Sequence, residues 1–333
     1  MPAIENSVLL EAVTEAYEAS GAAVFSKTRE RRNPRKFVLV SQRDAQTTEV
    51  WVYAWTLTPG GRPSLPFEFR IQMTSVSSPL ALNPNGPTVL LGYKPDSNMF
   101  AGFDLSQHKS FTVGSPSVQI DIRAVNEAKE SGLSFAQKTN SEIAIGIRPD
   151  QLLNYTLNAA QLHALGADAK AVELLRLAVD LKPLPSPQMD EIPLERMRVV
   201  QTISTLSRAS SFRRAVLTSY DNKCAATGTQ LQLVDAAHIL PVGAKGSSDK
   251  VQNGMCLAPT YHRAYDLGVI FVDEKYVMRP NSEKLDRLRM LHLDGGESKF
   301  IASLGPLRLP RARSDWPSIE MIRQANAFRG VRV

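Results

Sequence analysis

The hydrophobic pattern of the first 181 residues alternates between helical and strand-like spacing. Residues 7–20 carry apolar side chains at intervals of three and four and end at Gly21, which predicts an amphipathic helix. Short apolar or alternating runs predict strands at 37–40, 49–57, 67–73, 88–91, 115–122 and 142–147. Further helices are predicted at 123–131 and from 149 to 181. This half is expected to be a mixed α/β domain. Part of it is expected to be a β-sheet that could be barrel-like.

A proline-rich segment separates this half from the rest of the chain. Four prolines fall within LKPLPSPQMDEIP at 181–193, a composition typical of a linker or an extended connection. We therefore predict one domain at 1–182, a linker at 183–193 and a second domain at 194–333. The second domain begins with a basic helical stretch, and its last apolar segment, 309–328, is expected to pack back on the core.

The charge of the 333-residue chain is unevenly distributed. The net charge is +6, yet residues 1–170 hold 16 basic and 16 acidic side chains, so the whole excess lies in residues 171–333. A basic half suggests a polyanionic partner such as nucleic acid, although a solvated basic surface would explain it equally well. Two cysteines exclude a disulfide-stapled scaffold. Neither a membrane span nor a signal peptide is predicted, so a reducing cytoplasm is the expected compartment.

The segment 224–277 carries the most informative arrangement of residues. His238 follows an apolar run and precedes a proline, so it is predicted to end a strand. Asn253 and Gly254 form a strong turn signal, and 261–267 can form a short helix. A β-hairpin is predicted directly afterwards. The expected order is strand, loop, turn and short helix.

This order resembles the HNH endonuclease family, which has the ββα-metal fold. His238, Asn253 and His262 are spaced H-x14-N-x8-H, within the flanking sequences AAHI, NGMCL and HRAYDLG. The resemblance covers about residues 196–280. It implies an α+β chain and a metal-dependent DNA endonuclease that hydrolyses phosphodiester bonds. In that reading His238 takes the proton from the attacking water, Asn253 hydrogen-bonds across the loop, and His262 binds the metal.

The second metal ligand is less clearly marked. Many family members place an acid or a histidine directly before the base, where this chain has Ala237. Asp235 lies three residues before His238 and could reach the metal if the strand ends in a bulge, so it is the preferred ligand. Asp266, four residues after His262 on the same helix face, is the alternative. Surface or capping roles would explain both acids equally well. The expected cofactor is a divalent ion, Mg²⁺ first, with Mn²⁺ or Ni²⁺ as alternatives.

No structural zinc is expected in this chain. Many relatives carry two CxxC pairs, whereas here each pair is reduced to one cysteine, Cys224 and Cys256. Both are expected to be small buried side chains.

Arginines on the basic helical stretch are expected to contact DNA phosphates. Such contacts supply affinity without sequence information, and a solvated helix face is the alternative. The four candidates are Arg213, Arg214, Arg196 and Arg198.

The first half carries weaker signals. Trp51, Tyr53 and Trp55 alternate, so they share one face of a strand, which we interpret as a hydrophobic sheet face rather than a base-stacking platform. The loop-rich stretch 92–108 is of a kind that often carries recognition. Three histidines, His108, His163 and His292, are interpreted as structural, and Asp104 and Glu142 as isolated acids.

The overall order resembles modular restriction nucleases, in which an N-terminal specificity domain selects DNA and an HNH domain cuts it. The expected partner is double-stranded DNA, with or without modified bases, and a homodimer is expected if both strands are cut at a symmetric site. Two alternatives remain open. The first half could be an effector-sensing or oligomerisation module, or the chain could be a non-catalytic DNA-binding protein with a decayed HNH fold.

Overall fold

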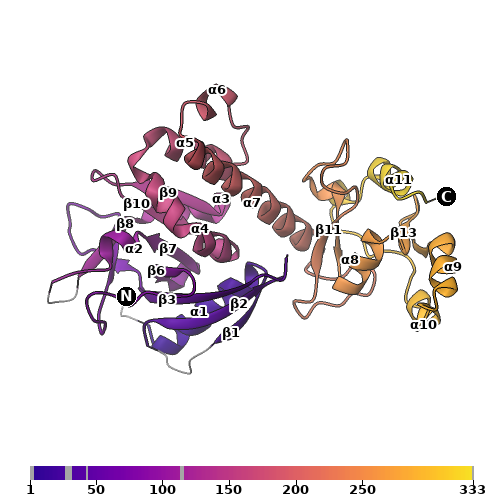
Figure 1. Cartoon of the computed structure of the whole chain (residues 1–333), viewed down its shortest axis with the longest axis horizontal. Coiled ribbons are helices and arrows are strands. Elements are labelled where there is room, and N and C mark those ends of the chain that lie inside the picture. The colour runs from indigo at the N-terminus through magenta and orange to yellow at the C-terminus, as the bar shows by residue number, and fades with distance from the viewer. Residues whose placement is uncertain (1–3, 27–31, 43, 113–115, 332–333) are drawn as a thin grey trace. The chain divides into compact units, whose positions relative to one another are not determined.

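The computed structural model of the chain describes residues 4–26, 32–42, 44–112 and 116–331. These residues form two compact units, which we call unit 1 (Met1–Ser207) and unit 2 (Arg208–Val333) (Figure 1). Within the described ranges, no helix is both long and apolar enough to cross a membrane.

Unit 1 is built on a seven-stranded sheet. Its strands are β1 (Ala22–Ser26), β2 (Arg35–Ser41), β3 (Thr47–Thr56), β6 (Thr88–Lys94), β7 (Met99–Phe103), β9 (Leu133–Gln137) and β10 (Ile143–Ile147). Their order is β1-β2-β3-β6-β7-β10-β9, and the β3–β6 pair is parallel while the others are antiparallel. Among the described residues, β1 and β9 are the two edges of this sheet, so it is open. The expectation of a barrel-like sheet is therefore wrong.

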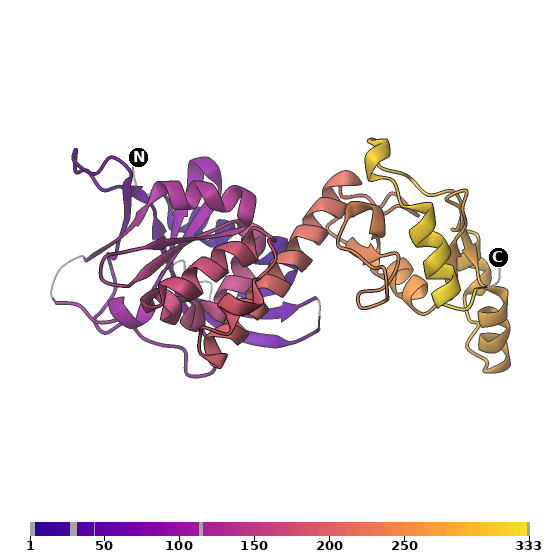
Figure 2. The same ribbon diagram turned by 90° about the horizontal axis from the view of Figure 1, so that it is seen from above.

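Helices cover one face of the seven-stranded sheet (Figures 1 and 2). They are α1 (Asn6–Ala19), α4 (Leu152–Ala164), α5 (Ala169–Val179) and the first part of α7 (Leu194–Ser219). Successive strand residues point to opposite faces. In β10, Ile143 and Ile145 therefore pack with these helices, whereas Ala144 packs on the other side.

The other face is covered by a three-stranded sheet and a helix. These elements are β4 (Thr58–Pro59), β5 (Glu68–Gln72), β8 (Ser117–Asp121) and α3 (Ile122–Ser131). Tyr53 and Trp55 are buried in this layer, with their rings stacked 6.2 Å apart, which confirms that they belong to a hydrophobic sheet face. Trp51 is half-buried beneath the Nζ of Lys36, 4.1 Å from its ring centre.

Strand β7 was not predicted from the sequence. It lies inside 92–108, the stretch expected to be loop-rich, together with the short helix α2 (Leu105–His108). All five residues of β7 are buried, so its pattern has no polar alternation to reveal it. Short 3₁₀ helices complete the unit at Pro95–Ser97, Pro149–Gln151 and Leu165–Ala167.

The division between the two units lies inside α7, further along the chain than the predicted linker at 183–193. That segment contains the short helix α6 (Ser186–Met189), and its Met189 and Ile192 are buried in the core of unit 1. These two apolar side chains explain why a proline-rich segment packs here instead of remaining an extended connection.

Unit 2 contains two small hairpins and several short helices. Its strands are β11 (Asp235–His238), β12 (Gly254–Leu257), β13 (Ile270–Val272) and β14 (Met278–Pro280). Its helical elements are η4 (Val251–Asn253), α8 (Pro259–Asp266), α9 (Ser282–Met290), α10 (Glu297–Ile301), η5 (Arg313–Asp315) and α11 (Ile319–Phe328). The last part of α7 contributes Phe212 and Val216 to its core, and α11 contributes Ile322 and Ala325.

Candidate functional site

The candidate site in unit 2 is a two-stranded hairpin followed by a helix. Strands β11 and β12 pair antiparallel, so that His238 lies opposite Gly254. His238 ends β11 as the sequence predicts, but the strand is shorter than the apolar run suggests. Leu231 and Leu233 are exposed, and the backbone turns at Leu231 with φ of 52°.

Two contacts hold the imidazole of His238. Its ring stacks on the ring of Phe212, with 3.7 Å between ring centres and 13° between ring planes. Its Nε2 lies 3.1 Å from Oδ1 of Asp249, which belongs to the loop between the two strands. The ring is therefore oriented by an aromatic face on one side and a carboxylate at one nitrogen.

Asn253 is fully buried and closes the loop between β11 and β12. Its Oδ1 accepts from the backbone N–H of Leu240 at 2.8 Å, and its Nδ2 donates to the carbonyl oxygen of Leu240 at 3.1 Å. The same nitrogen donates to Ser247 Oγ at 3.2 Å and to the carbonyl oxygen of Ser248 at 2.9 Å. The amide thus spans the loop that follows His238.

Gly254 is required here for space rather than for a turn. Its φ is −128°, an extended conformation, and it begins β12. A Cβ at this position would lie 2.3 Å from Cγ2 of Val216 and 3.1 Å from the ring of Phe212. Glycine therefore lets α7 approach the strand opposite His238, close enough for Phe212 to stack on the imidazole.

His262 lies on α8 between two carboxylates. Its Nδ1 is 3.8 Å from Oδ2 of Asp235, and its Nε2 is 3.4 Å from Oδ2 of Asp266. Asp235 and then Asp266 raise the pKa of His262 above its usual value, although partial burial opposes them. His262 in turn lowers the pKa of Asp235, and Arg213 adds to this effect. At 3.8 Å the Asp235 contact is an ion-pair distance, longer than a hydrogen bond.

A cleft of about 390 Å³ brings these groups together. Its lining includes His238, His262 and Asp266, the two histidines coming from β11 and α8. Asp235, the ligand preferred from the sequence, is not among its lining residues. The cleft therefore joins the first and last residues of the motif with the acid that the sequence left as the alternative.

Arg329 also lines the cleft, and the sequence did not indicate it. It follows α11, its side chain is 6% exposed, and its guanidinium lies 4.1 Å from the ring centre of Tyr265. Its Nη1 donates to the carbonyl oxygen of Ile239, and its Nη2 lies 3.9 Å from Asp266. Within the described residues, Nη2 is buried and makes no hydrogen bond. No local pattern around position 329 could have revealed this placement.

The donor groups of the cleft fit a divalent metal bound through few protein ligands. Among the described residues, no group of three or more His, Cys, Asp or Glu side chains is placed to hold a metal ion. One imidazole and one or two carboxylates are nevertheless suitable donors for Mg²⁺, Mn²⁺ or Ni²⁺. Mg²⁺ in particular usually keeps several waters and takes only one or two protein carboxylates.

The two cysteines are buried beside the hairpin. The backbone N–H of Ala258 points to Sγ of Cys224 at 3.2 Å, and burial raises the pKa of Cys256 to about 12. That zinc plays no structural role remains a prediction.

The four predicted DNA-contacting arginines lie in different settings. Arg196, in unit 1, forms an ion pair with Asp168, while Arg198 is exposed. In unit 2, Arg214 is exposed and Arg213 is half-buried near Asp235. The sequence has a further basic segment at 27–36, which could contact phosphates or be a solvated loop, and its residues 27–31 lie outside the described residues.

Comparisons with known proteins agree with this geometry. Residues 224–273 match the HNH endonuclease family, and residues 48–156 match a family described as Methylase-associated X1. No curated protein matches the chain. A solved structure titled "Modification dependent TagI restriction endonuclease" is similar over 85% of this chain and 81% of that one, at 13% identity. Its TM-score of 0.28 is too low to imply a shared fold. The segment that matches the HNH endonuclease family, residues 224–273, therefore contains His238, Asn253 and His262.

Proposed function

We propose that the chain is a metal-dependent DNA endonuclease of the restriction type, type II-like or modification-dependent. In this proposal unit 2 cuts and unit 1 selects the DNA. The observation that carries it is the cleft where His238, His262, Asp266 and Arg329 meet. The match of residues 224–273 to the HNH endonuclease family supports the same chemistry.

His238 is the proposed general base. An ionised carboxylate can only accept hydrogen bonds, so the contact with Asp249 requires the proton to lie on Nε2. In the neutral imidazole this leaves the lone pair on Nδ1. A water positioned at Nδ1 would give up its proton as it attacks the phosphorus. Phe212, stacked on the ring, restricts its rotation and so preserves this orientation.

His262 and Asp266 are the proposed metal ligands. The proximity of Asp235 to Nδ1 favours a proton on that nitrogen, which leaves the Nε2 lone pair on the side of Asp266. Asp235 then acts as the residue that orients the imidazole. A divalent ion bound here would supply Lewis-acid stabilisation of the phosphate and the leaving oxygen.

Arginines are proposed to hold the phosphate backbone. Arg329 lines the cleft, but its Nη2 is buried and lies 3.9 Å from Asp266, so we propose that its positive charge attracts a substrate phosphate without a direct hydrogen bond. Arg214 is exposed and is proposed as a contact outside the cleft. We expect Arg214→Ala to weaken binding to all DNA sequences alike and to lower the salt slope by about one unit.

The proposal is tested by a cleavage panel. The full chain is incubated with unmodified DNA and with DNA carrying 5-methylcytosine, 5-hydroxymethylcytosine or N6-methyladenine, in Mg²⁺, Mn²⁺, Ni²⁺ or a chelator. We expect cleavage of at least one substrate with a divalent ion and none with the chelator. Tight DNA binding without cleavage under every condition would instead favour the decayed, non-catalytic alternative.

A second measurement tests the assignment of the ligands. Mn²⁺ binding to the full chain is followed by electron paramagnetic resonance in Asp266→Asn and Asp235→Asn. We expect Asp266→Asn to abolish Mn²⁺ binding and Asp235→Asn to weaken it by about 10- to 100-fold, as for residues that orient a ligand. The reverse order would make Asp235 the ligand.

A further inference from the structure

Unit 1 contains a pocket of about 620 Å³ that no part of the nuclease mechanism uses. This volume lies within the roughly 300–1,000 Å³ of small-molecule sites. Its walls come from β6, the end of β7 with α2, the turn before β10, and α4 with the 3₁₀ helix that follows it. Most of its lining lies in residues 48–156, the segment that matches the Methylase-associated X1 family.

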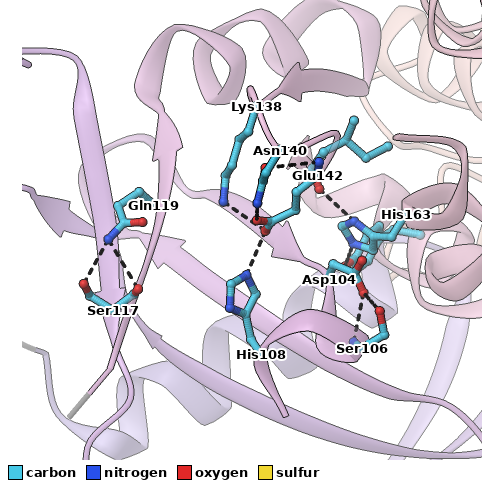
Figure 3. A network of polar contacts seen from close by, with 11 residues as sticks. Asp104, Ser106, His108, Ser117, Gln119, Lys138, Asn140, Glu142 and His163 are labelled. Carbon is cyan, nitrogen blue, oxygen red and sulfur yellow. Dashed lines mark hydrogen bonds and ion pairs between the residues drawn. The ribbon is translucent and has the colours of Figure 1, made fainter. Parts of the chain in front are cut away.

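Glu142 is a buried acid at one wall of this pocket. Its Oε1 accepts from Nε2 of His108 at 2.8 Å and from Nζ of Lys138 at 2.9 Å (Figure 3). Burial acts to raise the pKa of Glu142, but these hydrogen bonds outweigh it and lower the pKa to about 2. The carboxylate is therefore ionised at neutral pH. Among the described residues, its Oε2 has only a long 3.5 Å contact, from Asn140.

Tyr155 and His163 form a buried pair at the pocket wall formed by α4. Nδ1 of His163 lies 2.8 Å from the carbonyl oxygen of Ile143, so it must donate. Burial lowers the pKa of His163, so the ring is neutral and its Nε2 accepts from the hydroxyl of Tyr155 at 2.9 Å. The hydroxyl of Tyr155 thus donates its one proton to His163, and its oxygen can only accept further hydrogen bonds.

Asp104 contributes a second carboxylate beside His163 (Figure 3). Its Oδ1 caps α2 by accepting from the N–H and the hydroxyl of Ser106, at 2.9 and 2.6 Å. Its Oδ2 makes no hydrogen bond with any residue that the structure describes. Three side chains of the pocket can therefore accept further hydrogen bonds but not donate them: Asp104, Glu142 and Tyr155.

The rest of the lining is mainly apolar. Leu82, Val89 and Phe103 form one part, and alanines on α4 form another, including Ala159 and Ala160. Such a pocket suits a flat apolar ring with hydrogen-bond donors at one edge. The lining also includes the exposed Lys109, but the two carboxylates outnumber this one cation and disfavour a phosphate.

We propose that this pocket binds a nucleobase that carries an exocyclic amino group, with Asp104 and Glu142 accepting its N–H hydrogens. The choice of a nucleobase among donor-bearing rings rests on the proposed function, which supplies DNA as the substrate. The base reaches the pocket either turned out of a DNA strand or as a free nucleoside that acts as an effector. Thymine has no amino group and offers only its N3–H between two carbonyl oxygens, so it should bind more weakly.

The experiment uses the full chain and two kinds of probe. Adenosine, cytidine, guanosine and thymidine are titrated by calorimetry. A duplex with 2-aminopurine, whose fluorescence rises when the base leaves the stack, tests a base within DNA. Ala160→Phe fills the pocket from an exposed helix position, and Ala169→Phe is the matched control on α5, outside it. Asp104→Asn keeps the helix cap but replaces the carboxylate acceptor.

We expect at least one amino-bearing probe to bind and thymidine to bind at least about tenfold more weakly. Ala160→Phe should abolish this binding, Asp104→Asn should weaken it about 10- to 100-fold, and Ala169→Phe should leave it unchanged. Binding only of a free nucleoside would identify an effector site, and a fluorescence rise only in the duplex would identify a base reader. Both results support the pocket.

Binding that survives Ala160→Phe, equal binding of thymidine, or no binding of any probe would overturn the inference. Failure of the proposed function has a different signature. His238→Asn should leave binding in the pocket intact, so a working pocket without His238-dependent cleavage would contradict only the nuclease. Cleavage without pocket binding would contradict only this inference.

Discussion

Replacing Asn253 with alanine removes the amide that closes the loop after His238. The side chain makes four hydrogen bonds, two of them to the buried backbone of Leu240. Each neutral hydrogen bond contributes about 0.5–1.5 kcal/mol net, and a buried group left without a partner costs about 1–3 kcal/mol. Because Ser247 and Ser248 are only half-buried, water can replace part of the loss. We expect Asn253→Ala to destabilise unit 2 by about 2–4 kcal/mol.

Hydrogen exchange of the full chain, read by mass spectrometry on peptides from 235–266, measures this change unit by unit. A loss of 2–4 kcal/mol corresponds to a fall in protection of roughly 30- to 700-fold where exchange follows unfolding of the unit. Gln230→Ala is the matched control, since it removes an exposed amide that donates once to a backbone carbonyl. Protection that changes less than about threefold in Asn253→Ala, or as little as in Gln230→Ala, would refute the reasoning.

Three further outcomes follow from the structure. Glu142 has its pKa lowered from 4.5 to about 2 in the folded chain, so its contribution to stability is present above pH 4.5 and is lost as the pH falls toward 2. Urea unfolding should show this loss, at most about 3 kcal/mol from Glu142, and Glu142→Gln should remove that part of the dependence while the other carboxyl groups keep theirs; an unchanged dependence would contradict the ion-pair account. Gly102→Ala would place a Cβ 2.3 Å from the ring of Tyr155, so it should lower the free energy of unfolding by about 1–3 kcal/mol or more, and a neutral result would show that this contact is not tight. Gly254→Ala should displace Phe212 and slow DNA cleavage in a folded protein, so full activity would argue against the stacked ring as an orienting group.

Most of the helices and strands could be predicted because their apolar residues are periodic. The helices at 6–19 and 194–219 lie within one residue of the predicted ranges. Strand β7 was missed because both of its faces are buried, which leaves no alternation to read. Whether the sheet is open or closed could also not be predicted from the sequence, because this depends on which strands pair with each other.

The motif residues of the site could be found because they lie in one short segment whose strand, loop and helix are local. His238 and His262 reach the same cleft through the hairpin and α8 alone. Phe212 reaches the ring of His238 from α7, and Arg329 reaches the cleft from the end of α11. Both do so through tertiary packing that leaves no local pattern. The choice between the two acids likewise depends on whether the acid of β11 or the acid of α8 faces the cleft.

The pocket of unit 1 lay beyond sequence analysis for the same reason. Asp104, Glu142 and His163 are far apart in the chain and were interpreted as isolated or structural. The fold brings them to one pocket because β7 and β10 are neighbours in the sheet and α4 packs across both.

The central claim is that His238 performs the proton transfer in DNA cleavage. The most direct measurement compares single-turnover cleavage and DNA affinity of His238→Asn with those of His292→Asn, a matched change at an exposed histidine of unit 2. The account predicts that His238→Asn slows cleavage by about 10²- to 10⁴-fold, the range for a general base, with DNA affinity unchanged, and that His292→Asn cleaves normally. Cleavage by His238→Asn at the rate of the unaltered chain would contradict it.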